Sequence, residues 1–160
     1  MTPGRVVSLN RSNGGVPKRP VDEAWISIQG MEGDHQADRR HHGGPDRALS
    51  LYSLELIEQL QLDGHPITPG AVGENVTISG LDWTRMLPGA RLALGNVTIE
   101  LTTFAIPCKT IREAFVDGDF TVISPKVNAG WSRLYARVSS EGLLRVGAAV
   151  RILPLDGDWP

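Results

Sequence analysis

The sequence has very little cysteine, since Cys108 is the only one among 160 residues. A single cysteine excludes a disulfide within the chain, and a lone thiol is typical of a reducing compartment. The first residues lack the basic region and apolar run of a secretory signal. No apolar stretch approaches the roughly 18 to 20 residues that span a bilayer. We therefore expect a cytoplasmic protein with no membrane partner.

The chain also lacks an excess of charge of one sign, because 16 Lys and Arg stand against 18 Asp and Glu. Without a basic field, a nucleic acid polymer is not expected as a partner. A GxxxxGK[ST] phosphate loop, a strand-linked GxGxxG and a GxSxG elbow are missing as well. The histidines and the cysteine do not have the paired spacing of a structural zinc site. These absences argue against conventional nucleotide-binding and serine hydrolase folds.

Aromatic residues make up only 6% of the chain, whereas Gly (18) and Pro (11) are abundant. This composition favours many short elements joined by turns. We predict a mainly β fold, a compact barrel-like single domain over 1–160, with two or three short helices that cover the barrel mouth. The expected strands are 5–10, 16–21, 24–29, 48–52, 75–79, 91–94, 97–103, 134–139, 143–146 and 148–153.

Two local predictions are specific. Gly95-Asn96 is a two-residue turn between apolar alternating segments, which indicates a hairpin, and we expect the last three strands to be connected in the same way. Ser53 is a good N-cap for a helix over 54–62, and residues 110–115 have helical composition.

The segment 30–47 is rich in Gly, His, Asp and Arg and nearly free of apolar residues, which indicates a surface loop. Its glycines allow backbone N–H groups to approach an anion, and Arg47 could donate a forked pair of hydrogen bonds to a phosphate. Any of its histidines, His35, His41 or His42, could transfer protons. The alternative is a solvated loop whose Asp and Gly residues only build turns.

Cys108 follows a proline and stands at the start of the predicted helix 110–115. Helix N-terminal N–H groups and the neighbouring Lys109 both favour a thiolate. A thiolate suits nucleophilic attack or a soft metal, and a metal-free thiol enzyme with His42 as base is one alternative. The other alternative is that Cys108 is simply a small buried hydrophobic residue.

Two further groups are less specific. The triplet Gly73-Glu74-Asn75 precedes an expected strand, and an asparagine there could recognise the edge of a heterocycle or only form a strand-entry turn. Lys126, Arg133 and Arg137 are basic residues around the segment 128–131. They could neutralise a phosphate or form a solvated strand face.

Taken in order, these segments resemble the MOSC family, the C-terminal domain of molybdenum cofactor sulfurases, in its small stand-alone bacterial form. The match runs over about 30–153. The segments that carry it are GDHQAD at 33–38, HGGPDRA at 42–48, GENVT at 73–77 with GL at 80–81, PC at 107–108, and GW at 130–131 followed by YARV at 135–138 and the glycines at 142 and 147.

The resemblance implies a molybdenum cofactor (molybdopterin) with the Cys108 thiolate as protein ligand to the metal. It implies a catalytic role for Cys108 and His42. The implied cofactor-binding residues are Gly43, Gly44, Arg47, Asn75, Lys126 and Arg137. Arg47 and Lys126 would contact the pterin phosphate, and Asn75 would bond the pterin or hold the Cys108 loop.

The same resemblance implies an oxidoreductase that reduces N-hydroxylated small molecules, including hydroxylamino base analogues, by oxygen-atom transfer. No iron–sulfur cysteine cluster or flavin signature is seen, so we expect a separate electron-donor protein. The alternative is a non-catalytic carrier of the cofactor, or of sulfur as a Cys108 persulfide. A pyridoxal-phosphate domain, which the large sulfurases carry, is not expected in this chain.

Overall fold

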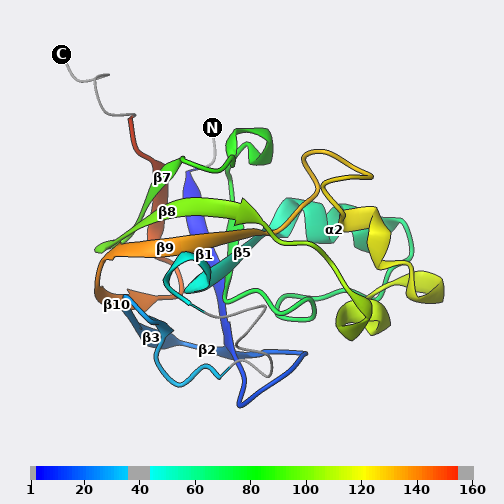
Figure 1. The fold of residues 1–160 in the computed structure, drawn as a ribbon, viewed down its shortest axis with the longest axis horizontal. Helices are drawn as coiled ribbons and strands as arrows, with labels where there is room; N and C mark the ends of the chain where they lie inside the picture. Colours follow the sequence, from blue (N-terminus) through cyan, green and yellow to red (C-terminus); the bar gives the residue numbers. More distant parts are fainter. Residues whose placement is uncertain (1–2, 36–43, 155–160) are drawn as a thin grey trace.

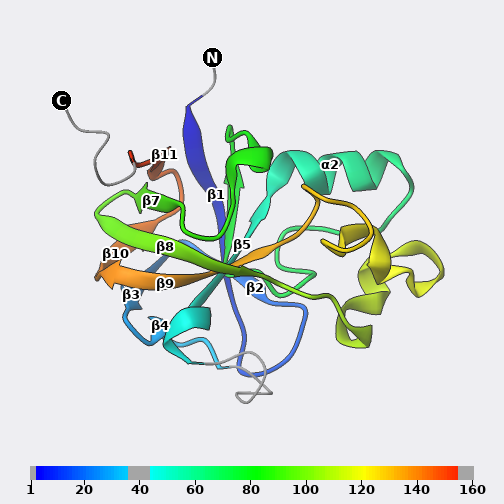
Figure 2. The same ribbon diagram turned by 45° about the horizontal axis from the view of Figure 1, so that its top comes forward.

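The structure is a computed structural model that describes residues 3–35 and 44–154. Figures 1 and 2 show a strand-rich body, with the helix at Leu54–Leu62 and the helical turns of residues 109–123 on one side of it. The elements in chain order are β1 (Gly4–Arg11), β2 (Arg19–Val21), β3 (Glu23–Ser27), β4 (Gly30–Met31), η1 (Pro45–Arg47), β5 (Leu49–Ser53), α2 (Leu54–Leu62), β6 (Val76–Ser79), η2 (Trp83–Arg85), β7 (Arg91–Leu94), β8 (Val97–Phe104), η3 (Lys109–Ala114), η4 (Val116–Gly118), η5 (Phe120–Ile123), β9 (Leu134–Ser140), β10 (Gly142–Arg145) and β11 (Ala149–Ile152).

Seven strands close into a barrel. Their order is β1-β11-β7-β8-β9-β5-β6, with β6 returning to β1, and β2 extends the sheet beside β1. The β5–β6 pair is parallel and the other neighbouring pairs are antiparallel, because α2 and a long loop carry the chain back between β5 and β6. The predicted mainly β, barrel-like fold is confirmed.

Local patterns explain how the barrel is filled. Along β8 the side chains of Val97, Ile99 and Leu101 are fully buried and alternate with partly exposed positions, as expected for a strand with one face on a core. Helix α2 begins where predicted, since Ser53 Oγ accepts a hydrogen bond from the Leu56 backbone N–H at 3.2 Å.

The chain after β9 does not form the expected hairpins. Strand β10 pairs with β3, with Leu143 opposite Trp25, and together with β4 they form a separate three-stranded sheet. Strand β11 pairs with β7 and β1 and so closes the barrel. The prediction of a hairpin here was wrong because alternation sets which face of a strand is buried but not which strand it pairs with.

Two other expected segments differ from the structure. The segment 30–47 is not loop throughout, since Gly30 and Met31 are buried in β4 and residues 45–47 form η1. Gly30 has a φ of 121°, and a Cβ there would lie 2.5 Å from the Ala48 carbonyl oxygen, so the close packing requires glycine. The strand expected over 16–21 is limited to β2, since Pro17 has no backbone N–H to donate and the Lys18 backbone N–H donates to the Gly70 carbonyl in a loop.

The second predicted helix is a 3-10 helix, η3, and its neighbours η4 and η5 are 3-10 turns as well. With α2 they lie beyond the ends of β5, β8 and β9 in Figure 2. Among the described residues, the helices are all too short or too polar to cross a bilayer.

Candidate functional site

A cavity of about 500 Å³ lies where the end of β8, the segment that follows it and the segment entering β9 meet the loop before β2. Its wall combines apolar side chains with a thiol and several cations. The described residues that line it are Gly15, Val16, Lys18, His35, Arg47, Ser50, Val72, Gly73, Phe104, Ile106, Pro107, Cys108, Thr110, Ile111, Arg133 and Tyr135. We refer to it as the thiol cavity; its volume is in the range of small-molecule sites.

Cys108 opens into this cavity and is partly buried. It is the cap residue immediately before η3, with an extended backbone (φ −142°), and Pro107 fixes the chain ahead of it. The Cys108 Sγ lies 2.9 Å from Thr110 Oγ1, so the hydroxyl can donate to a thiolate or accept from a thiol. The local sequence therefore presents one oriented sulfur to the cavity.

Two arginines supply positive charge to the same wall. The Arg47 guanidinium carbon lies 5.3 Å from the centre of the Tyr135 ring, a cation–π arrangement that orients this side chain. Burial raises the pKa of Tyr135, which keeps its phenol neutral beside the two arginines. Arg133 is 8% exposed and donates from Nη1 to the Val72 carbonyl at 2.8 Å. Both guanidinium groups are thus held by neighbours while they line the cavity.

Lys18 is the third cation of the wall. Its Nζ lies 2.7 Å from Asp34 Oδ2, and both side chains are more than nine-tenths buried. Gly70 allows this position because its backbone packs against that of Lys18, where a Cβ would lie 2.3 Å from the Lys18 carbonyl oxygen. Asp34 also accepts from the Ser12 backbone N–H at 2.9 Å. The carboxylate therefore ties the lysine to the end of β1.

Asn75 joins the segments behind the cavity. Its Nδ2 donates to Asp34 Oδ2 at 2.9 Å and to the Asn10 carbonyl at 3.3 Å, and its Oδ1 accepts from the Ser50 backbone N–H at 3.1 Å. The side chain is buried and is not among the residues that line the thiol cavity. In the described structure Asn75 fixes Asp34 and β5, whereas the loop that carries Cys108 is held by other contacts.

The remaining predicted site residues lie elsewhere. Gly44 lines a second cavity, and Lys126 is exposed and outside the described lining of the thiol cavity. Arg137 faces solvent and pairs with Asp46 Oδ1 at 2.8 Å and Glu100 Oε2 at 3.1 Å. His42, Gly43 and His41 lie outside the described residues. Of the predicted residues, the structure brings Cys108 and Arg47 together in one cavity.

Lys18 was not predicted as a site residue, and Arg133 was predicted only as one of three basic residues that could neutralise a phosphate or form a solvated strand face. Lys18 stands between Pro17 and Pro20, where the pattern suggested only an interrupted strand. Nothing in that stretch indicated that the ammonium group would be buried against Asp34. Asp34 itself belongs to the 33–38 segment, so the motif contains one half of the ion pair.

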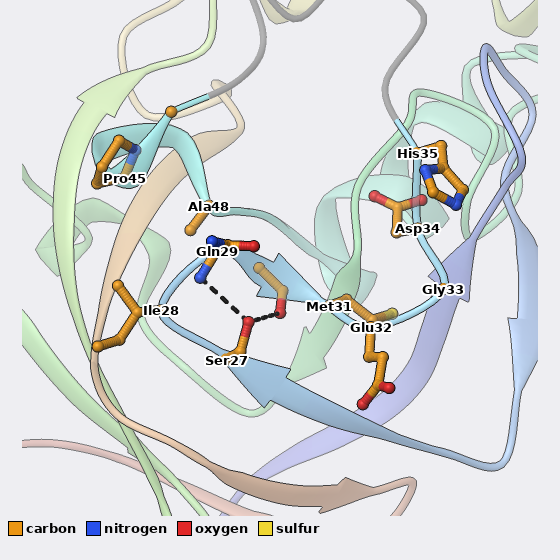
Figure 3. A pocket seen from close by; sticks show the side chains of 12 residues that line it. Ser27, Ile28, Gln29, Met31, Glu32, Gly33, Asp34, His35, Pro45 and Ala48 are labelled. Atoms are coloured by element: carbon orange, nitrogen blue, oxygen red, sulfur yellow. Dashed lines mark hydrogen bonds between the residues drawn. The ribbon is translucent and has the colours of Figure 1, made fainter.

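The second cavity, of about 780 Å³, lies beside the turn between β3 and β4. Figure 3 shows Asp34 and His35 on one side of it and Ile28 and Pro45 on the other. His35 lines both cavities. The described residues that line this second cavity include no lysine, no arginine and no cysteine. The thiol and the cations are therefore found in the thiol cavity.

Comparisons with known proteins agree with this architecture. A family model described as the MOSC domain matches residues 38–151. YflK of Bacillus subtilis (strain 168) is 30% identical, with 87% of this chain and 63% of YflK aligned. YiiM of Escherichia coli (strain K12) is also 30% identical, with 89% of this chain and 73% of YiiM aligned. The chain thus spans less than two thirds of the length of YflK.

Solved structures show the same fold. YiiM from Geobacillus stearothermophilus superposes with a TM-score of 0.73 at 24% identity, over 98% of this chain and 78% of that one. YiiM from Escherichia coli superposes with a TM-score of 0.65 at 23% identity, over 98% of this chain and 71% of that one. These likenesses extend over the whole barrel.

Proposed function

Because this chain belongs to the MOSC domain family, which is associated with molybdenum cofactor binding, we propose that it binds this cofactor in the thiol cavity and reduces N-hydroxylated compounds. The observation that carries the proposal is that Cys108 and the guanidinium groups of Arg47 and Arg133 line one cavity of about 500 Å³. A soft sulfur and several cations are what a metal bound by an anionic pterin requires of a protein.

Two features of the thiol cavity fit a molybdenum cofactor. Cys108 offers a single sulfur, which would leave other metal positions open for substrate. Arg133 has a buried Nε without a hydrogen-bond partner, and such an atom is costly unless a ligand or water satisfies it. Arg47, Arg133 and Lys18 would hold the pterin phosphate through charge-assisted hydrogen bonds.

When bound, the cofactor would supply two-electron chemistry that accepts the oxygen of an N–O bond. Reduction of an N-hydroxyl group to N–H consumes two electrons and two protons and releases water. His35 lines the cavity and is a candidate to deliver a proton; His42 keeps its predicted role as a second candidate. The electrons would come from a separate donor protein, which stays a prediction.

The test is molybdenum and pterin content after expression in a host that makes the cofactor. We expect Cys108→Ser to lose most of its molybdenum while keeping the thermal stability of the wild type, since the change removes only the soft ligand. Arg137→Gln is the control, because its guanidinium faces solvent outside the cavity. Equal molybdenum in wild type and Cys108→Ser would contradict the ligand assignment.

Turnover needs a separate measurement. Loaded protein is reduced chemically, and its reoxidation is followed on adding a hydroxylamine or an N-hydroxylated base analogue. Reoxidation that depends on this substrate is expected. If the cofactor-loaded protein retains the cofactor but is never reoxidised, the reductase proposal is contradicted and a non-catalytic carrier of the cofactor is favoured.

A further inference from the structure

Cys108 is the only cysteine of the chain, and it lines the thiol cavity beside polar and charged side chains. It is partly buried, and its Sγ lies 2.9 Å from Thr110 Oγ1. A cavity of about 500 Å³ admits a reagent of a few atoms to this sulfur. The reactivity of the thiol therefore depends on the groups that surround it in the cavity.

The wall of the same cavity holds a donor that lacks an acceptor. Arg133 is 8% exposed and donates from Nη1 to the Val72 carbonyl, whereas its Nε is buried without a hydrogen-bond partner. Such a donor is costly unless a ligand or water accepts from it. Arg47 adds a second guanidinium group, which is held over the Tyr135 ring. The sulfur therefore shares its cavity with cations that can stabilise negative charge on a small oxygen-containing ligand.

We propose that Cys108 is a site of reversible oxidation by peroxides and that the thiol cavity promotes this reaction in the cofactor-free protein. The sulfur attacks one oxygen of hydrogen peroxide, so that an S–O bond forms and the O–O bond breaks. The other oxygen leaves as hydroxide and takes up the proton of the thiol. One thiol and one peroxide thus give one sulfenic acid and one water, with sulfur oxidised by two electrons and the peroxide reduced by two.

The neighbouring groups have separate parts in this step. The guanidinium groups of Arg133 and Arg47 stabilise the negative charge that develops on the departing oxygen. The Thr110 hydroxyl is hydrogen-bonded to the sulfur and keeps it oriented in the cavity. Because the chain has a single cysteine, the sulfenic acid cannot form a disulfide within the molecule, and an external thiol must reduce it.

The oxidation also bears on the proposed function, because the same sulfur would serve as the metal ligand. A sulfenic acid carries an oxygen on this sulfur and is not the thiolate that a soft metal requires. Oxidation would therefore prevent cofactor loading, and a bound cofactor would protect Cys108 from peroxide. Only this consequence rests on the proposed function, since the oxidation itself needs no cofactor.

The test follows sulfenic acid formation in cofactor-free protein at one fixed pH. Hydrogen peroxide is added, and the product is trapped for mass spectrometry with dimedone, which labels sulfenic acid and not methionine sulfoxide. We expect Cys108 to be oxidised roughly tenfold faster in the folded protein than in the same protein unfolded in urea, a factor that corresponds to one charge-assisted hydrogen bond in the transition state. Without dimedone, dithiothreitol should restore the thiol.

Substitutions separate the contributions of the cavity wall. Arg133→Gln removes a cation and should slow the oxidation about tenfold. Thr110→Val removes the hydroxyl and should slow it about threefold, whereas Thr110→Ser keeps the hydroxyl and should react as the wild type does. Arg137→Gln makes the same chemical change as Arg133→Gln but outside the cavity, and this control should leave the rate unchanged.

The proposal is overturned if folded and unfolded protein are oxidised at the same rate, if Arg133→Gln and Thr110→Val both react as fast as the wild type, or if dithiothreitol does not restore the thiol. Should Arg133→Gln fail to fold, the comparison of folded with unfolded wild type and the two Thr110 variants decide. Failure here is distinguishable from failure of the proposed function, because the oxidation assay contains no cofactor, whereas the ligand assignment is tested by the molybdenum content of Cys108→Ser.

Discussion

Arg133 and Arg137 lie four residues apart, yet they belong to different regions of the molecule. Arg133 is 8% exposed in the wall of the thiol cavity, with a buried Nε that has no partner. The Arg137 side chain is 45% exposed and is neutralised by Asp46 and Glu100. The same residue type is therefore available to a ligand in one region and occupied by surface carboxylates in the other. Burial and pairing, rather than charge alone, distinguish a binding residue from a surface residue.

The largest difference in stability is expected between a buried ion pair of the cavity wall and an exposed ion pair of the surface. Asp34→Asn leaves the buried Lys18 without its counter-charge, and we expect the free energy of unfolding to fall by about 3 kcal/mol. Urea unfolding monitored by circular dichroism measures it. The control is Glu23→Gln, which breaks the exposed pair with Arg145 and should cost roughly 0.5 kcal/mol. Equal losses would show that the cavity wall is as well solvated as the outer surface.

The next contrast concerns binding by the two arginines. Arg133→Gln removes a charged donor from the cavity, and we expect sulfate affinity to fall by about thirtyfold, which corresponds to about 2 kcal/mol. The loss is read from a ¹⁵N–¹H NMR titration of cofactor-free protein with inorganic sulfate. Arg137→Gln should leave sulfate affinity unchanged. If Arg137→Gln weakens binding as much as Arg133→Gln does, the anion binds outside the thiol cavity and the comparison fails.

Features that depend on neighbouring residues were predictable from the sequence. Ser53 as the cap of α2 and the turn at Gly95 rest on local hydrogen bonds and backbone preferences, and both occur as expected. The pairing of β10 with β3 was not predictable in this way. It joins segments more than a hundred residues apart, and alternation leaves the identity of the partner open.

The candidate site likewise has one feature that the local sequence predicts and one that depends on distant segments. The motif around Cys108 indicated an oriented thiol, and Cys108 does line the cavity with Arg47. The two-residue period of a strand would place Arg133 and Arg137 on the same side of the chain. The two arginines differ in exposure, because other segments of the chain cover Arg133 in the wall of the cavity, whereas Arg137 faces solvent. The covering segments are distant in the sequence, so the sequence around the two arginines does not predict this difference.

The smallest effect is expected for the stability contribution of Arg137. Its ion pairs with Asp46 and Glu100 are on the surface, where solvent and salt screen them, so Arg137→Gln should lower the melting temperature only slightly. Thermal unfolding of both proteins at low and at high salt measures this. The difference between wild type and Arg137→Gln should shrink as salt is added, whereas the corresponding difference for the buried Asp34→Asn should persist. A large loss in Arg137→Gln that salt does not reduce would mean that the outer face of β9 is covered in solution, and Arg137 would then belong with Arg133.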